Sequence, residues 1–202
     1  MTIRLSAIAE QQYRTQPVFE EKAGWRILQN IQAVTSSNIM VCDLSHRPKA
    51  IVIGPDMDHR MFPGKGRAQW HQDAWYAGLS RDEGHYYNLL GDLNPVRLPA
   101  GAVDMTDAWT LMAVYGNDAK KLMNRLVIID IDPFLEQGPC FFATRVHNAK
   151  VYILNMRNNR GFLIACDRSF GHDLYEMCFN APVFLRIQPA VEVDFHVWLK
   201  SG

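Results

Sequence analysis

The chain has 202 residues, of which 48% are hydrophobic and 21% charged, so intrinsic disorder is excluded as its dominant state and one domain with a sizeable core is expected. Its 21 basic and 21 acidic side chains cancel, which argues against binding to nucleic acid or to an anionic membrane surface. No segment has the roughly 20 continuous apolar residues of a membrane-spanning helix, and no signal-peptide pattern opens the chain. A cytoplasmic protein is expected.

The first half of the chain gives three local patterns. Apolar residues at helical spacing predict a helix over residues 19–31. The β-branched run Ala50–Ile53, which a Gly-Pro pair closes, predicts a buried strand. Residues 57–100 are irregular and rich in aromatic side chains, and a short helix is expected there from Asp82 to Leu90.

The second half has a tighter pattern of strands and helices. In order, the sequence predicts a turn and strand over 102–115, a helix over 119–126 capped by Asp118, a hairpin of strands 140–146 and 150–156, a strand over 162–167, a helix over 170–179 and a half-buried final strand over 186–198. These elements favour an α+β domain whose mixed or antiparallel sheet is covered by helices near 19–31, 118–126 and 170–179.

A weak internal repeat links the two halves. Asp43 and Ser45 precede a strand that ends in Gly-x-Asp, and Asp104 and Thr106 precede another, with Asp-to-Gly spacings of 11 and 12. Such a unit makes physical sense, because the acid and the hydroxyl form a turn before the strand and the glycine permits positive φ after it. The half-units are expected at about 39–62 and 101–181, with an insertion at 63–100.

Two stretches resemble a known family. Residues 43–56 read DLSHRPKAIVIGPD, which resembles the motif D-L-S-H-x-G-K-x-x-V-x-G-x-D of the glycine-cleavage T-protein (aminomethyltransferase) family, except that Pro48 stands where the family has Gly. The segment 101–181 is most similar to the gamma subunit of heterotetrameric sarcosine oxidase, a small member of the same folate-binding-domain superfamily. The matching features are Ala102–Thr106, Gly116–Ala119, Leu122, Ile129–Pro133, Gly138–Cys140, Thr144–Arg145, Val151–Leu154 and Arg168–Phe170.

The resemblance implies a fold and a limited chemistry. It implies a domain of the folate-binding (T-protein N-terminal) type. The family uses an aspartate in a short glycine-rich stretch to hold the folate and the reacting amine, and the best-matching stretch here, residues 147–154, has no carboxylate. A neutral Val151 or Tyr152 cannot stabilise the positive charge of a transferred aminomethyl group. No catalytic residue is therefore carried over.

Two functions are the main candidates, and a free-standing homo-oligomeric scaffold is a third possibility. The first is a non-catalytic accessory subunit, without a cofactor of its own, of a flavin- and folate-dependent amine oxidoreductase, bound to larger flavoprotein subunits or to itself. The second is a stand-alone enzyme of one-carbon metabolism that resembles a tetrahydrofolate-dependent aminomethyltransferase. Asp104, Asp130 and Tyr152 are the candidates for holding tetrahydrofolate, although turn-forming roles are the simpler interpretation of both aspartates.

Metal binding is not expected. The cysteines, at positions 42, 140, 166 and 178, form no Cys-x-x-Cys pair, so four buried free thiols are expected. His71, Asp73 and His85 could ligate a metal, but they lack the helical His pair of a zinc site.

The aromatic segment 63–90 is the predicted contact surface. Its rings could instead belong to the core, but Tyr and Trp dominate protein interfaces because they bury a large area and keep a polar group. The residues assigned to partner binding or self-association are Trp70, Trp75, Tyr76, Tyr86 and Tyr87.

Overall fold

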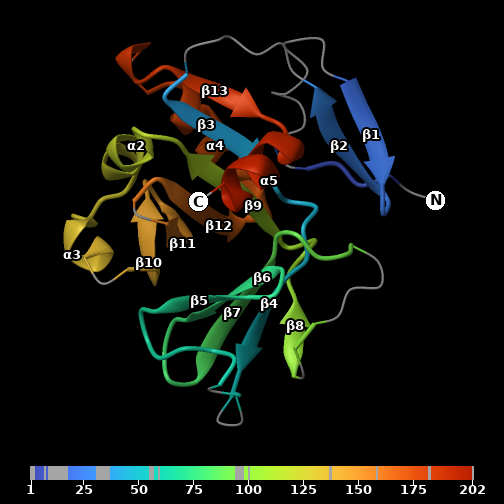
Figure 1. The fold of residues 1–202 in the computed structure, drawn as a ribbon, viewed down its shortest axis with the longest axis vertical. Helices are drawn as coiled ribbons and strands as arrows, with labels where there is room; N and C mark the ends of the chain where they lie inside the picture. Colours follow the sequence, from blue (N-terminus) through green and yellow to red (C-terminus); the bar gives the residue numbers. More distant parts are fainter. Residues whose placement is uncertain are drawn as a thin grey trace.

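Three β-sheets form the framework of the chain (Figure 1). The computed structural model describes residues 3–6, 8, 18–30, 37–54, 57, 58, 60–93, 98, 99, 101–136, 138–157, 159–181 and 183–201. A hairpin consists of β1 (Val18–Lys22) and β2 (Trp25–Asn30). The six-stranded sheet has the order β10 (Cys140–Val146), β11 (Ala149–Arg157), β12 (Gly161–Asp167), β9 (Trp109–Tyr115), β3 (Ile39–Asp43) and β13 (Ile187–Ala190). The five-stranded sheet has the order β5 (Ala68–His71), β6 (Ala74–Gly78), β7 (Glu83–Asn88), β4 (Lys49–Ile53) and β8 (Ala102–Asp104).

Four α-helices accompany these sheets in the described part of the chain. They are α2 (Ala119–Leu126), α3 (Asp132–Leu135), α4 (Gly171–Phe179) and α5 (Glu192–Lys200). The chain is therefore an α+β domain, and all strand pairs within the two larger sheets are antiparallel except β3 with β13.

The order of the strands reveals an internal duplication. The sequence β5-β6-β7-β4-β8 in one sheet has the same pattern as β10-β11-β12-β9-β3 in the other. In this correspondence β3 matches β8 and β4 matches β9. Each repeat therefore contributes its first strand, β3 or β8, to the sheet of the other repeat. The internal duplication predicted from the sequence is confirmed. Residues 63–100, which the sequence suggests to be an insertion, contain the three strands β5–β7.

The two acid–hydroxyl turns of the repeat are equivalent in three dimensions. The backbone N–H of Ser45 donates to Asp43 Oδ1 over 2.9 Å, and that of Thr106 donates to Asp104 Oδ1 over 2.8 Å. Each turn lies where the chain passes from one sheet to the other, between β3 and β4 or between β8 and β9. The acid–hydroxyl motif found in the sequence therefore forms the turn at which the chain changes sheets.

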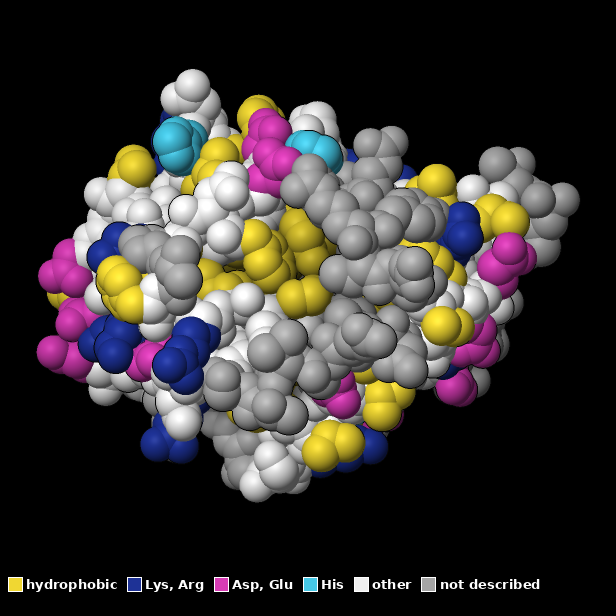
Figure 2. All heavy atoms as spheres, turned by 90° about the horizontal axis from the view of Figure 1, so that it is seen from above, with side chains coloured by type: hydrophobic (Ala, Val, Ile, Leu, Met, Phe, Trp, Pro, Cys, Tyr) yellow, Lys and Arg dark blue, Asp and Glu magenta, His cyan; other side chains and the backbone are white. Residues whose placement is uncertain are grey.

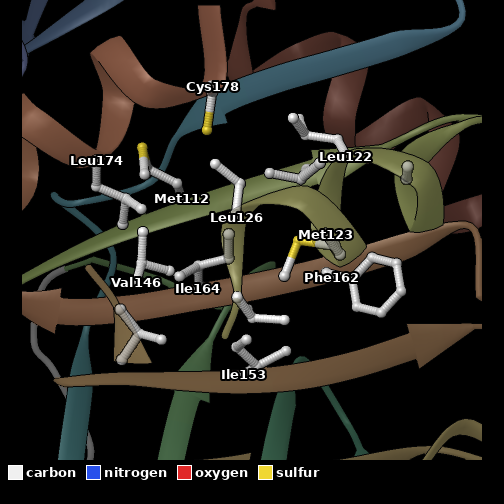
Figure 3. Close-up of a cluster of buried hydrophobic side chains, with 14 of the residues drawn as sticks. Met112, Leu122, Met123, Leu126, Val146, Ile153, Phe162, Ile164, Leu174 and Cys178 are labelled. Atoms are coloured by element: carbon white, nitrogen blue, oxygen red, sulfur yellow. The ribbon is translucent and has the colours of Figure 1, made fainter. Parts of the chain in front are cut away.

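One hydrophobic core lies between the six-stranded sheet and two helices. Figure 3 shows side chains of α2 and α4 packed against β9, β11 and β12. The buried residues of α2 recur at helical spacing (Ala119, Leu122, Met123 and Leu126), which explains why the helix forms there. Strands β9 and β12 are buried almost throughout, so they appear in the sequence as continuous apolar runs.

A second core fills the space between the two larger sheets. It joins Trp75 and Tyr87 of the five-stranded sheet to Leu111 and Phe141 of the six-stranded sheet. Backbone hydrogen bonds also join the edges β5 and β10, since Ala68 N–H donates to the Pro139 carbonyl (3.2 Å). The two sheets thus pack as layers that are connected at one edge.

The structure corrects three predicted elements. The helix expected over 19–31 is wrong, because residues 18–30 form the β1–β2 hairpin around Ala23 and Gly24, both at positive φ. The helix expected from Asp82 to Leu90 is also wrong, since β7 pairs on both sides within the five-stranded sheet. Residue 31 lies outside the described residues.

The final strand predicted over 186–198 is the third correction. Only Ile187–Ala190 is a strand, and the alternating residues after it form α5. Alternation placed Val193, Phe195 and Val197 on one face, whereas the helix buries Phe195 and leaves both valines exposed. The buried ion pairs of Glu192, at the first position of α5, fix the start of this helix.

The helix after Asp118 is confirmed, but the capping role is not. The Asp118 side chain makes no cap hydrogen bond. It accepts a hydrogen bond from Asn38 Nδ2 (2.9 Å) and pairs with Lys121 Nζ (2.7 Å) instead. Asp56, its counterpart in the repeat, lies outside the described residues.

The other strands and helices of the second half are confirmed. They include β9, which follows the turn at Asp104–Thr106, the β10–β11 hairpin, β12 and α4, while residues 102–104 before that turn form β8. Figure 2, a view from above, shows hydrophobic side chains near the centre of this face and charged groups of both signs toward its edges. None of the helices in the described part of the chain is long and apolar enough to cross a membrane.

Candidate functional site

The core between the two larger sheets contains three side chains of β7 that are linked by hydrogen bonds. Glu83, His85 and Tyr87 occupy alternate positions of the strand, so their side chains share the face that meets the other sheet. Glu83 Oε1 lies 3.0 Å from His85 Nε2, and Tyr87 Oη lies 3.1 Å from His85 Nδ1. Because a carboxylate can only accept, Nε2 carries the hydrogen and Nδ1 accepts from the tyrosine. The three groups therefore connect a half-buried carboxylate to a buried phenol.

Aromatic rings enclose the imidazole of His85. Its ring centroid lies 4.5 Å from that of Tyr152, 4.8 Å from that of Phe141 and 5.2 Å from that of Trp109, on which it stacks. Lys150 Nζ lies 4.7 Å from the centroid of the Tyr152 ring. His85 is fully buried. The arrangement is a polar relay embedded in an aromatic cage.

Burial sets the protonation of this relay. Burial lowers the pKa of His85, although the hydrogen bond to Glu83 opposes it. The same hydrogen bond lowers the pKa of Glu83, and burial raises the pKa of Tyr87 well above its ordinary value. The phenol is neutral, and His85 is fully buried with a hydrogen bond at each ring nitrogen, so the relay is suited to hold a proton or orient a ring rather than to attack a substrate.

A buried lysine lies where the two repeats cross. Lys49 Nζ donates to the carbonyl oxygens of Ser45 (2.7 Å), Arg47 (3.0 Å) and Thr106 (3.2 Å). Burial lowers the pKa of Lys49 to about 7, while Asp43 and then Asp104 oppose the shift. These three acceptors belong to both sheet-changing turns, so Lys49 joins the two halves of the fold.

A second polar cluster attaches α5 to the turn after β3. Glu192 Oε1 pairs with Arg47 Nε and lies 3.0 Å from His46 Nε2 and 3.5 Å from His196 Nε2. Burial raises the pKa of Glu192, but the hydrogen bond of His46 and the charges of His46 and Arg47 outweigh it and lower the pKa to about 2. The family-like His46 thus has a structural partner at the far end of the sequence.

The three candidate folate residues do not come from one region. Asp104 ends β8 and uses Oδ1 in its turn, and Asp130 Oδ1 likewise accepts from Asp132 N–H (3.0 Å) after α2. Figure 1 separates β8 from the α2–α3 segment. Tyr152 is the one that belongs to the His85 cluster.

The expectation that five aromatic residues form an exposed surface is wrong for four of them. Trp75, Tyr76, Tyr86 and Tyr87 are all buried, because β6 and β7 are inner strands of the five-stranded sheet. Trp70 on the edge strand β5 is 37% exposed and packs edge-on against Trp75 at 5.5 Å between centroids. The core interpretation holds for the buried rings.

Sequence reasoning missed His85 and Lys49 as central residues. The alternation Glu83, His85, Tyr87 was available as a signal, but it points to one face only once the segment is a strand. Lys49 matches the lysine of the family motif, but the motif does not indicate its burial, since a lysine beside an apolar run is normally exposed.

The comparisons with known proteins agree with this architecture. No protein-family model matches the sequence, and no curated protein matches it. The chain is similar in structure to aminomethyltransferase T of the glycine cleavage system from Bartonella henselae, with a TM-score of 0.70 and 14% identity over 94% of this chain. It spans 60% of the length of that transferase chain.

A second solved structure matches over a different share of its length. It is heterotetrameric sarcosine oxidase from Corynebacterium sp. U-96 in complex with pyrrole 2-carboxylate, with a TM-score of 0.58 and 13% identity over 78% of this chain and 91% of that chain. Identities this low establish the fold alone. The chain therefore has the T-protein-like fold that the glycine-cleavage aminomethyltransferase and a chain of heterotetrameric sarcosine oxidase share, as the sequence resemblance implies.

Proposed function

We propose that the chain is a non-catalytic accessory subunit of a larger flavin- and folate-dependent amine oxidoreductase. The observation that carries this proposal is the match to 91% of a chain of a heterotetrameric oxidase. The share of the transferase chain that this chain spans is smaller, at 60%. The likeness supports membership of such a complex, and both the membership and the accessory role are our inference.

The chemistry of the described residues supports a structural role. The hairpin of β10 and β11 includes residues 147–154, where the family resemblance implies a catalytic aspartate, and no carboxylate stands in this stretch. The relay of Glu83, His85 and Tyr87 is packed between two sheets, with a phenol whose pKa is raised. Neither feature supplies a nucleophile or a general base to a substrate.

Trp70 is the candidate anchor for a partner. It stands on the edge strand β5, and an exposed tryptophan that is rigidly backed by another ring is a favourable contact for a second protein. The partners would be the larger flavoprotein subunits or a second copy of the chain.

Co-expression with flavoprotein subunits of a heterotetrameric sarcosine oxidase tests the accessory role. We expect a stoichiometric complex in sedimentation, weakened by Trp70→Ala. Phe170→Ala is a matched control, since Phe170 is 38% exposed on a different element. A chain that sediments alone beside these subunits would contradict the proposal.

The second candidate is a stand-alone tetrahydrofolate-dependent enzyme of the aminomethyltransferase kind. The higher TM-score of 0.70, over 94% of this chain, favours it. Titration with a reduced folate distinguishes the two. Saturable micromolar binding that is lost in Asp104→Asn would support the enzyme, because asparagine keeps the Asx turn to Thr106 and removes only the charge. Failure to bind would leave the accessory subunit as the function.

A further inference from the structure

The two repeats differ in what covers their outer faces. Helices α2 and α4 pack on the outer face of the six-stranded sheet. On the five-stranded sheet, alternate residues of β6 and β7 point away from the inter-sheet core, and Tyr76 and Tyr86 are among them. A groove of about 560 Å³ lies beside these tyrosines. Its volume is in the range of small-molecule sites.

The two tyrosines line the groove. Tyr76 is 7% exposed and Tyr86 is 6% exposed, and their ring centroids are 5.2 Å apart. Neither hydroxyl has a hydrogen-bond partner within the part of the chain that the structure describes. Burial raises the pKa of Tyr86 to about 12, with the neighbouring Tyr76 and Asp73 adding to it, so the phenol is neutral at physiological pH. A hydroxyl that faces the groove can form a hydrogen bond with a ligand there.

The described side chains that line the groove carry a negative charge. Asp73 and Asp92 are among the residues that line it, His71 is the other titratable side chain besides the tyrosines, and the described lining contains no lysine or arginine. Asp73 and Tyr86 line the same groove, and the Asp73 charge contributes to the raised pKa of Tyr86. A cation is therefore the ligand charge that this lining favours.

The backbone around the groove is already fixed. The carbonyl of Asp73 accepts from the N–H groups of Leu89 (2.9 Å) and Leu90 (3.0 Å). Asn88 Oδ1 accepts from Gly91 N–H (2.8 Å), and its Nδ2 donates to the Asp92 carbonyl (3.3 Å). Both carboxylates are thus attached to positions that hydrogen bonds hold in place, which lowers the cost of ordering them around a ligand.

We propose that this groove binds a small organic cation, a protonated amine with an apolar substituent. Its ammonium group lies between the Asp73 and Asp92 carboxylates and donates to a tyrosine hydroxyl oxygen. Its apolar part contacts the side chains of Met61 and Leu98, which also line the groove. The binding does not depend on the accessory role, because every residue involved belongs to this chain.

Three probes of the same shape test the charge preference. Benzylammonium, benzyl alcohol and benzoate share a ring and differ in charge, and their binding to the full chain is followed by NMR titration at low salt. We expect saturable binding of benzylammonium, binding of benzyl alcohol at least about threefold weaker, and no binding of benzoate. The expected difference between benzylammonium and benzyl alcohol is modest because exposed carboxylates form weak ion pairs. Equal affinities for benzylammonium and benzyl alcohol would overturn the proposal.

Variants then locate the site. Asp73→Asn and Tyr86→Phe should each weaken benzylammonium binding, whereas Glu21→Gln, which removes a carboxylate from the β1–β2 hairpin, should not. Binding is compared for variants whose unfolding midpoint matches that of the parent, and Tyr76→Phe replaces Tyr86→Phe if the latter unfolds. Unchanged affinity in Asp73→Asn and in the tyrosine variant would overturn the assignment to this groove. Weaker binding in Glu21→Gln to the same extent would also overturn it, because it would indicate a general effect of net charge.

Discussion

Ser45 and Thr106 perform the same task in opposite halves of the fold. The Ser45 hydroxyl accepts a hydrogen bond from the backbone N–H of Leu111 over 3.2 Å, and the Thr106 hydroxyl accepts one from the backbone N–H of Lys49 over 3.2 Å. Each hydroxyl therefore satisfies one backbone N–H group in a strand of the other repeat, Leu111 in β9 and Lys49 in β4. This reciprocity explains why a hydroxyl follows the aspartate by two positions in both copies of the motif.

Removing either hydroxyl should destabilise the fold. Ser45→Ala and Thr106→Val each leave a buried backbone N–H without a partner, so we expect each to lower the free energy of unfolding by about 1–2 kcal/mol. Urea unfolding measures this. Thr106→Ser keeps the hydroxyl and should lose less than Thr106→Val. A loss below about 0.3 kcal/mol in both variants would mean that these bonds do not hold the crossing together.

Lys49 should be essential to the crossing of the repeats. Lys49→Met leaves three buried carbonyl oxygens without their donor, and we expect a loss of at least about 2 kcal/mol in urea unfolding. The contribution of Lys49 to the free energy of unfolding should also depend on pH. Burial lowers the pKa of Lys49 to about 7, so between pH 7 and pH 10 the unfolded chain binds more protons at this residue.

The stability of the parent relative to Lys49→Met should therefore rise with pH, by up to about 1 kcal/mol per pH unit. The comparison at pH 7, 8 and 9 cancels the titration of other groups. A difference that stays constant over this range would show that Lys49 remains charged in the folded protein.

Glu192 should make the chain acid-sensitive. Its pKa is lowered to about 2 because the hydrogen bond of His46 and the charges of His46 and Arg47 outweigh the effect of burial. A lowered carboxyl pKa contributes stability above about pH 4.5, and that contribution disappears as the pH falls toward 2.

Glu192→Gln should therefore cost about 2 kcal/mol at pH 6 and clearly less at pH 3. Urea unfolding of the parent and the variant at both values measures the difference, and the exposed Glu21→Gln serves as the control. Equal costs at pH 3 and pH 6 would contradict the ion pairing of Glu192.

The two neighbouring tryptophans should behave differently. Trp75 lies in the inter-sheet core, and we expect Trp75→Ala to lower stability by about 3–5 kcal/mol. Trp70 is partly exposed, and we expect Trp70→Ala to cost less than about 1 kcal/mol while weakening assembly with the oxidase subunits. Urea unfolding and sedimentation separate the two effects. A large loss of stability in Trp70→Ala would assign this ring to the core as well.

All four cysteines should be free but unreactive in the native protein. They are buried and unpaired, and burial raises the pKa of Cys140 to about 11 and those of Cys166 and Cys178 to about 12. A thiol reagent at pH 7.5 should therefore react slowly with the folded chain and with four thiols after unfolding. Fewer than four reactive thiols, or stoichiometric zinc in elemental analysis, would contradict this interpretation.

Local patterns predicted two kinds of element: helices, whose backbone hydrogen bonds are internal, and strands that pair with a neighbour in the sequence. The apolar stripe of Leu122, Met123 and Leu126 predicts α2, and the alternation on both sides of His147 predicts the β10–β11 hairpin. The internal duplication was also visible, because its acid–hydroxyl turns are local motifs. The T-protein-like fold followed from the order and spacing of such motifs.

The candidate site could be predicted only in part. Tyr152 was singled out, and the structure places it against His85. Asp104 and Asp130 were singled out with it, but each carboxylate belongs to a turn of its own. The aromatic segment 63–90 is distinctive in the sequence, but the sequence does not show which of its rings face the six-stranded sheet.

The sequence by itself determined the class of the domain, the duplicated turns and the helices α2 and α4, because each rests on contacts within a few residues. Only the tertiary structure decided that residues 18–30 form a hairpin, that residues 83–88 are an inner strand and that residues 192–200 are a helix. The physical reason is that these segments take their conformation from distant partners. Strand β7 lies between β6 and β4, and α5 begins where Glu192 meets Arg47, a residue from the opposite end of the chain.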